Sequence, residues 1–203
     1  MNLSKKAGNI SPSITLSITA KANELKAQGV DVVSFGAGEP DFNTPQNIIN
    51  AAIKAMQDGK TKYTPAGGIL ELKKTICKKF KEDNGLDYAT DQITISTGAK
   101  QCLANVFMAI LNPGDEILIP IPYWVSYPEL VKLADGVPVF VETLKENNYK
   151  YTIEDLEKAV SDKTKAILIN SPNNPTGTIY NREELIEIAE FAKKHDLLII
   201  SDE

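Results

Sequence analysis

From Asp91 onward, short apolar runs alternate with amphipathic segments of helical length. The predicted strands cover residues 93–97, 116–120, 137–142, 166–170 and 197–201, and the predicted helices cover residues 100–111, 124–134, 153–160 and 182–195. Strands that alternate with helices of about 10 to 15 residues are typical of a mainly parallel sheet with helices on both faces. The predicted fold class is therefore α/β, with a parallel, doubly covered sheet.

The pattern before Asp91 is less regular. Residues 1–20 are rich in Ser and Thr with little periodicity, so we expect an arm there, followed by a helix over residues 20–28 that Gly29 stops. A short strand is predicted over residues 30–35, and it leads into a glycine-containing loop over residues 36–42. Apolar residues at helical spacing predict two further helices, over residues 45–58 and 68–84.

Composition excludes several classes of function. The chain has 203 residues, 22 Lys and Arg against 27 Asp and Glu, and a net charge of −5, so a nucleic-acid partner is not expected. No apolar run approaches the length of about 18 residues that suggests a membrane span, and we expect a cytoplasmic protein with no membrane partner. Cys77 and Cys102 lack metal-ligand spacing, so we expect reduced packing thiols and no metal site.

The chain contains a single histidine, His195, at the polar end of a predicted helix. A cation there complements the helix C-terminus, so we interpret His195 as structural. Without a second histidine, a multi-histidine metal site is excluded within these residues, and a Ser/His/Asp triad would require His195 itself. Demanding chemistry would therefore have to come from a cofactor.

A polar turn, Asn170-Ser-Pro-Asn-Asn-Pro-Thr-Gly177, follows the apolar run that ends at Ile169. Its prolines and glycine prevent regular strand pairing, and its short polar side chains can bond a ligand or their own backbone. The apolar strand that ends near Ile200 runs into Asp202 in the same way. In open α/β sheets ligands bind beyond the carboxyl ends of parallel strands, so both polar tips are predicted to face one crevice.

Two further segments suggest a ligand with a phosphate and a planar ring. Gly98-Ala-Lys100 stands between a predicted strand and a helix, where backbone N–H groups can bind an anion, although an ordinary strand–helix junction has the same pattern. Trp124, the only tryptophan, follows a strand and could stack on a planar ligand or pack in the core. With Asn174 as an amide and Asp202 as a carboxylate for a ring nitrogen, these groups describe a pocket for pyridoxal 5′-phosphate.

The chain resembles the N-terminal half of a class I, aspartate-type aminotransferase dependent on pyridoxal phosphate. The resemblance is carried, in family order, by Gly36-Ala-Gly-Glu-Pro-Asp-Phe42, Lys62-Tyr-Thr-Pro-Ala-Gly-Gly68, Ser96-Thr-Gly-Ala-Lys-Gln101, Pro122-Tyr-Trp-Val-Ser-Tyr-Pro128, Asn170–Gly177 and Ser201-Asp-Glu203. It implies the cofactor-binding large domain of that family in truncated form. The implied division places an N-terminal arm and part of the small domain in residues 1–44 and the incomplete large domain in residues 45–203.

The resemblance also implies a role for particular residues. Gly98, Ala99 and Lys100 would hold the cofactor phosphate, and Trp124 would stack on the pyridine ring and border the substrate. Asn174 would bond the phenolic oxygen and reach the substrate carboxylate, and Asp202 would pair with the pyridinium nitrogen. Gly38 would border the substrate carboxylate, Tyr63 would reach the phosphate in a neighbouring subunit, which implies a homodimer, and Ser11, Ser13 and Thr15 of the arm could line the site.

The family's Schiff-base lysine and its substrate-binding arginines have no counterpart up to Glu203. The resemblance implies a parent enzyme that moves an amino group, most simply from aspartate to 2-oxoglutarate, by a ping-pong mechanism, whereas aromatic, alanine or prephenate substrates also stay open. We expect the chain by itself to have little or no activity, because a lysine at the reacting carbon is needed for the proton transfers. Two other interpretations are open: an aminotransferase-like effector-binding module, and a fragment without an independent function.

Overall fold

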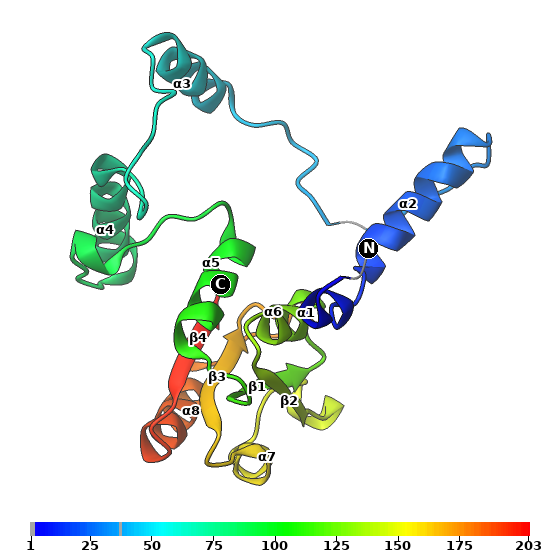
Figure 1. Ribbon diagram of the computed structural model, residues 1–203, viewed down its shortest axis with the longest axis vertical. Coiled ribbons are helices and arrows are strands. Elements are labelled where there is room, and N and C mark those ends of the chain that lie inside the picture. Colours follow the sequence, from blue (N-terminus) through cyan, green and yellow to red (C-terminus); the bar gives the residue numbers. More distant parts are fainter. Residues whose placement is uncertain (1–2, 37) are drawn as a thin grey trace. The chain divides into compact units, whose positions relative to one another are not determined.

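The computed structural model describes residues 3–36 and 38–203, so Ala37 of the predicted loop and the start of the arm lie outside the described residues. The chain divides into two compact units: one contains residues up to Ile14 together with Gly98–Glu203, and the other contains Thr15–Thr97. The elements of each unit are labelled in Figure 1. None of the described helices is both long and apolar enough to cross a bilayer.

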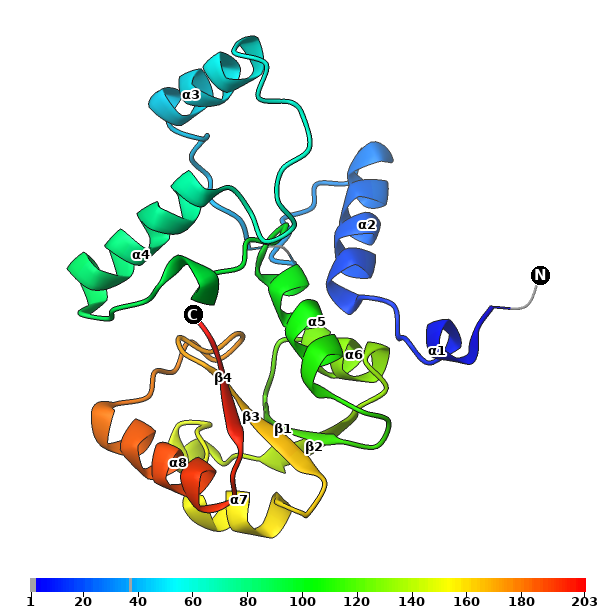
Figure 2. The same ribbon diagram turned by 60° about the vertical axis from the view of Figure 1, so that its left-hand side comes forward.

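The first unit contains a four-stranded sheet in the order β2-β1-β3-β4. Its strands are β1 (Glu116–Ile121), β2 (Val137–Glu142), β3 (Thr164–Asn170) and β4 (Leu198–Asp202). Each neighbouring pair is parallel, and the order shows that the chain crosses over between strands (Figure 2). The predicted parallel α/β sheet is confirmed, and the bounds of these four strands agree with the prediction to within two residues.

One face of the sheet is covered by α5 (Ala99–Ile110) and α6 (Ser126–Leu133). Phe107 of α5 and Val131 of α6 are fully buried against Ile117 and Ile119 of β1. Alternate residues of a strand point to opposite faces, so Leu118 between them belongs to the other layer of core.

The opposite face is covered by α7 (Ile153–Ala159) and α8 (Arg182–Lys194). Leu156, Ile188 and Phe191 of these helices pack with Leu118 and Ile167 of the sheet. Because apolar residues on both faces of β1 and β3 are buried, these strands are continuous apolar runs, as is typical of parallel sheets. The predicted double cover is therefore confirmed.

Further helices lie in the N-terminal part of the chain: α1 (Lys5–Gly8), α2 (Ile14–Ala27), α3 (Gln46–Gln57) and α4 (Leu70–Asn84). Two 3₁₀ turns, η1 (Thr90–Gln92) and η2 (Lys145–Asn147), complete the described elements. The predictions for α3 and α4 are confirmed, but α2 begins six residues before the predicted start at Ala20, and α1 was not predicted. The Thr19 hydroxyl donates to the Thr15 carbonyl 3.0 Å away, so it bonds within the helix instead of competing with it.

Two predicted strands, over residues 30–35 and 93–97, are not strands in the structure. Both segments are extended or irregular, and the backbone N–H of Ile95 donates to the Gly67 carbonyl, 3.1 Å away. An apolar run becomes a strand only when a neighbouring strand pairs with its backbone groups, and no described strand lies beside either segment. The predictions were wrong because an apolar pattern does not specify a pairing partner.

The interpretation of His195 as structural agrees with its position as the C-terminal cap of α8. Its Nε2 lies 3.2 Å from a carboxylate oxygen of Glu157, and its ring packs on Phe191 with the centroids 4.5 Å apart. Cys77 and Cys102 are free thiols, as predicted.

Helix α8 begins with a reciprocal cap that we expect to make stability depend on pH. The Asn181 side chain accepts from the Glu184 backbone N–H, Glu184 accepts from the Asn181 backbone N–H, and Lys150 donates to Glu184. Burial raises the pKa of Glu184, but the hydrogen bonds from Lys150 and Asn181 outweigh it, so the net pKa is below the ordinary value. The carboxylate thus stabilises the fold above pH of about 4.3, and this contribution is lost as the pH falls through the lower, folded-state pKa.

The variant Glu184→Gln is therefore expected to lower the free energy of unfolding by about 1 kcal/mol at neutral pH and by less once the pH is well below about 4.3. Urea unfolding of both proteins at the two pH values measures the difference. Glu183→Gln, which changes the exposed neighbouring carboxylate, is the matched control and should have a small effect at either pH. An equal loss for Glu184→Gln at both pH values would contradict the assignment.

Candidate active site

The candidate site lies at the carboxyl edge of the sheet, where β1, β3 and β4 end. Because the strands are parallel, the segments that follow Ile121, Asn170 and Asp202 emerge at the same edge. The Asn173 side-chain amide donates to the Pro122 carbonyl 3.4 Å away, and the Asn170 amide donates to the Asp202 carbonyl 2.9 Å away. The two polar tips that follow β3 and β4 thus lie at one edge of the sheet, and the segment after β1 lies beside the loop that follows β3.

The N-terminus of α5 provides backbone donors for an anion. Gly98 caps the helix with a φ of 84°, which only glycine adopts easily, and no side chain of a described residue caps it. The N–H groups of Gln101 and Cys102 donate to the Gly98 carbonyl, whereas those of Ala99 and Lys100 donate to no backbone carbonyl of the described residues. Free N–H groups at the positive end of a helix dipole are suited to a phosphate.

The Lys100 ammonium lies over the Trp124 ring, 4.9 Å from its centroid. Trp124 is half-buried and packs against the core, which is one of the two interpretations that the sequence left open, and its stacking on a planar ligand stays a prediction. A cation on the indole face is a stabilising arrangement, and it places the α5 N-terminus beside the segment that follows β1. The contact of Lys100 with a phosphate stays a prediction.

The Asp202 carboxylate accepts a hydrogen bond from the Tyr127 hydroxyl, with 2.7 Å between the oxygens. The bond involves Oδ2, which leaves Oδ1 as the oxygen that a ligand could bond. Tyr127 was not among the residues predicted for the site. The available signal was its spacing, because a residue three positions after Trp124 lies on the same face of the helix predicted over residues 124–134. In the structure α6 begins only at Ser126, and the Trp124 and Tyr127 rings meet edge to face with 5.2 Å between centroids.

The loop after β3 is held by its own polar residues. The Asn174 backbone N–H donates to Oδ1 of Asn170, 2.7 Å away, which leaves the exposed Asn174 side chain free to point at a ligand. Asn173 is buried, and its amide donates to the Thr176 hydroxyl. The three asparagines therefore differ in role. The side chains of Asn170 and Asn173 make hydrogen bonds within the loop, and the Asn174 side chain is exposed on it.

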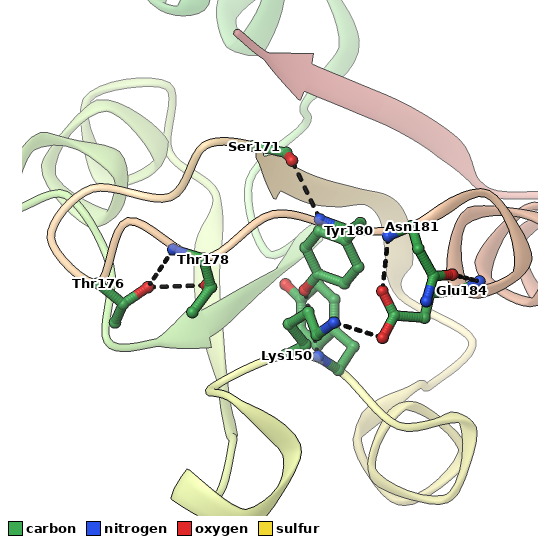
Figure 3. Close-up of polar contacts among 8 residues, drawn as sticks. Lys150, Ser171, Thr176, Thr178, Tyr180, Asn181 and Glu184 are labelled. Carbon is green, nitrogen blue, oxygen red and sulfur yellow. Dashed lines mark hydrogen bonds and ion pairs between the residues drawn. The ribbon is translucent and has the colours of Figure 1, made fainter.

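The far end of this loop is anchored at α8 (Figure 3). The Tyr180 backbone N–H donates to the Ser171 hydroxyl 3.2 Å away, and the Tyr180 hydroxyl accepts from the Tyr151 backbone N–H. The Lys150 ammonium lies 5.9 Å from the centroid of the Tyr180 ring while it pairs with Glu184. Both ends of the loop are fixed, so the position of Asn174 is defined by the fold.

A cavity of ≈ 350 Å³ lies between residues 10–14 and α6, with Lys100 and Tyr123 on its wall. Ser11 and Ser13, which the resemblance placed in the arm, both line it. The arm is tied to α6 because the Ser11 N–H donates to the Glu129 carboxylate 2.8 Å away. The cavity contains neither Asp202 nor Asn174, so it adjoins the predicted site without including the ring-binding groups.

Gly38, Tyr63 and Thr15 belong to the second unit. Tyr63 is fully exposed, and a Cβ atom on Gly38 would meet nothing within 4 Å. Their roles at the site stay predictions. Among the described residues, no group of His, Cys, Asp and Glu is arranged to hold a metal ion.

Most of the chain matches the sequence profile of a known protein family. The sequence profile of the family described as aminotransferase class I and II matches residues 30–203. The chain therefore belongs to the class I and II aminotransferases. Pyridoxal phosphate is the cofactor expected for members of this family.

Among its relatives, the aspartate aminotransferase of Bacillus sp. (strain YM-2) is 59% identical over 201 residues, which are 99% of this chain and 51% of the relative. That of Bacillus subtilis (strain 168) is 57% identical over 203 residues, 100% of this chain and 52% of the relative. A structure of the Thermus thermophilus aspartate aminotransferase with maleate has a TM-score of 0.96 and 46% identity, and the match covers 100% of this chain and 53% of that one. The chain thus spans about half the length of the relatives it matches.

The residues present fit pyridoxal phosphate. The uncapped N-terminus of α5 suits a phosphate, the Trp124 indole suits a planar ring, and the Asp202 carboxylate has one oxygen available for a protonated ring nitrogen. Gly98, Ala99, Lys100, Trp124 and Asp202 are in the same compact unit, so one fold sets their relative positions.

Proposed function

We propose that this chain is the cofactor-binding part of an aminotransferase that moves an amino group from aspartate to 2-oxoglutarate. The observation that carries the proposal is the Asp202 carboxylate, which the end of β4 and the hydroxyl of Tyr127 hold at the sheet edge, with the Tyr127 ring against Trp124. The relatives named aspartate aminotransferase support the choice of amino donor. Maleate, named with the Thermus thermophilus structure, is a dicarboxylate, as aspartate and 2-oxoglutarate are.

Each proposed residue has a distinct role. The N–H groups of Ala99 and Lys100 bind the phosphate, and Trp124 supports the ring. Asp202 keeps the ring nitrogen protonated, because a carboxylate at hydrogen-bond distance favours the charged form of its partner. Asn174 bonds the phenolic oxygen and reaches the substrate carboxylate, and Gly38 borders that carboxylate. When bound, pyridoxal phosphate would supply an electron sink, which accepts the electron pair that is left when the bond to the substrate's α-hydrogen breaks.

Assembly and location are part of the same proposal. The fully exposed Tyr63 supports a homodimer in which this tyrosine reaches the partner subunit's phosphate site. The free cysteines are in keeping with a cytoplasmic location. We also propose that residues 1–44 form the arm and part of the small domain, and that residues 45–203 belong to the large domain.

The chain by itself is expected to bind pyridoxal phosphate but to show no steady transamination. No lysine up to Glu203 matches the family's Schiff-base lysine, so proton transfer at the reacting carbon lacks its base. Cofactor binding is measured by quenching of the fluorescence of Trp124, the only tryptophan. Turnover of aspartate and 2-oxoglutarate is measured for the chain alone and for a joined protein, in which the remaining half of the Bacillus subtilis relative follows Glu203.

Turnover by the joined protein and none by the chain alone is the expected result. Steady transamination by the chain alone would contradict the proposed division of roles. Absence of cofactor binding by both proteins would overturn the proposed function and would favour an effector-binding module or a fragment without function.

A further inference from the structure

We propose that Tyr127 is a positioning residue that fixes the Asp202 carboxylate in the orientation needed to bond the cofactor's ring nitrogen. The proposal rests on the proposed function, in which Asp202 bonds the ring nitrogen of pyridoxal phosphate. It explains why Oδ2 of Asp202 is bonded to Tyr127 and not to a ligand. The role assigned to Tyr127 is indirect: it acts through Asp202 and touches neither substrate nor the reacting atoms.

The hydrogen bond joins two distant parts of the chain. Tyr127 belongs to the first turn of α6, after β1, whereas Asp202 is the last residue of β4, and the two oxygens are 2.7 Å apart. In the sheet, β3 lies between β1 and β4. The Tyr127 side chain, which follows β1, therefore extends past β3 to reach the carboxylate at the end of β4. The bond thus holds the end of the edge strand β4 against α6.

Both partners of the bond are held firmly. Tyr127 is 1% exposed and packs in the core layer with Phe107, Ile119 and Leu168. The Asp202 main chain is fixed separately, because its carbonyl accepts from the Asn170 amide and from the Ser171 N–H. With the main chain fixed, the remaining freedom of Asp202 is rotation of its side chain, and the phenol restrains this rotation by bonding Oδ2.

The direction of this hydrogen bond does not change with physiological pH. Burial raises the pKa of the Tyr127 phenol far above its ordinary value, and the hydrogen bond to Asp202 adds to the effect. The phenol therefore stays neutral and acts as the donor, with Oδ2 of Asp202 as its acceptor. Oδ1 is left to accept from a protonated ring nitrogen, and such charge-assisted bonds are sensitive to geometry.

A matched pair of tyrosine variants separates this role from general stability. Tyr151 is also buried, in the core layer on the other face of the sheet, where its hydroxyl donates to the Leu118 and Leu168 carbonyls at 3.2 and 3.0 Å. Tyr127→Phe and Tyr151→Phe each remove one buried hydroxyl and keep the ring. We expect Tyr127→Phe to raise the dissociation constant of pyridoxal phosphate about tenfold, and Tyr151→Phe to leave it within about twofold, by Trp124 fluorescence titration of the 203-residue chain.

A double-mutant cycle tests whether Tyr127 acts through Asp202. In the Asp202→Ala background, Tyr127→Phe is expected to change the dissociation constant by less than about twofold, because the group to be positioned is gone. The same tenfold loss in both backgrounds would overturn the proposal. Unchanged affinity of Tyr127→Phe alone would overturn it and leave the proposed function intact, whereas failure of the unmodified chain to bind the cofactor would overturn both.

A second measurement covers the case in which Tyr127→Phe does not fold. Asp202→Ala keeps the Tyr127 ring but removes the acceptor of its hydroxyl, so a buried donor is left unpaired and the urea midpoint of unfolding should fall. Glu203→Gln, which changes the exposed next residue, is the control and should leave the midpoint unchanged. An unchanged midpoint for Asp202→Ala would show that the pair is not formed in solution and would overturn the proposal.

Discussion

Replacement of Asp202 by alanine is expected to lower the rate of amino-group transfer by about 10²- to 10³-fold. The carboxylate lies at the end of β4 with one oxygen bonded to Tyr127 and the other available to a ring nitrogen. Without a negative charge at hydrogen-bond distance the ring nitrogen loses the partner that keeps it protonated, and the electron sink is weakened. A fixed charge that acts on developing charge in a site of this kind contributes on the order of 3 to 4 kcal/mol.

The rate is measured as a single turnover of the joined protein, after saturation with pyridoxal phosphate, so that weaker cofactor binding does not contribute. Asp202→Asn is expected to resemble Asp202→Ala because it also lacks the charge. Glu203→Gln, which changes the exposed carboxylate next in the chain, is the control and should keep the rate within about threefold. A rate for Asp202→Asn close to that of the unmodified protein would rule out the electrostatic role.

Replacement of Phe107 by alanine is expected to lower the free energy of unfolding by about 3 to 5 kcal/mol. Phe107 is 0% exposed and lies in α5, where it packs against Ile117 of β1 and Leu168 of β3. Truncation removes the contacts of the ring and leaves a cavity that the neighbouring strands cannot fill, because the sheet fixes their positions. Since α5 also carries the predicted phosphate donors, the same change should weaken cofactor binding.

Urea unfolding, followed by far-ultraviolet circular dichroism, measures the loss. Met108→Ala is the matched control, because Met108 is the next residue of α5 and is 56% exposed. Its substitution should change the free energy of unfolding by less than about 0.5 kcal/mol. A loss below about 1 kcal/mol for Phe107→Ala would show that α5 does not pack on the sheet as described.

Local pattern predicted the elements of the first unit well. The apolar runs that became β1 to β4 are long enough, and rich enough in Ile, Leu and Val, to specify strands of a parallel sheet, and the two central strands, β1 and β3, are buried. The end of α8 is also readable, since His195 marks its C-terminal cap. These features depend on residues that are neighbours in the chain, and such contacts leave a periodic signal.

Pairing between distant segments was less predictable. Residues 30–35 and 93–97 have the composition of strands but no described strand pairs with them, and composition cannot reveal a missing partner. The bond between Tyr127 and Asp202 was missed for the same reason, as it joins residues 75 positions apart. Lys100 was predicted to hold the phosphate, and only the tertiary structure showed that its ammonium lies over the Trp124 ring.

The sequence by itself determined the parallel α/β class, the position of the polar turns after the strands and, through its motifs, the resemblance to an aminotransferase. Those properties follow from local periodicity and from short runs of residues. Only the tertiary structure decided which oxygen of Asp202 is available and that Asn170 and Asn173 shape the loop while Asn174 is presented by it. Hydrogen bonds between side chains depend on the three-dimensional distance and orientation of groups that the sheet brings together, and a linear pattern does not contain that information.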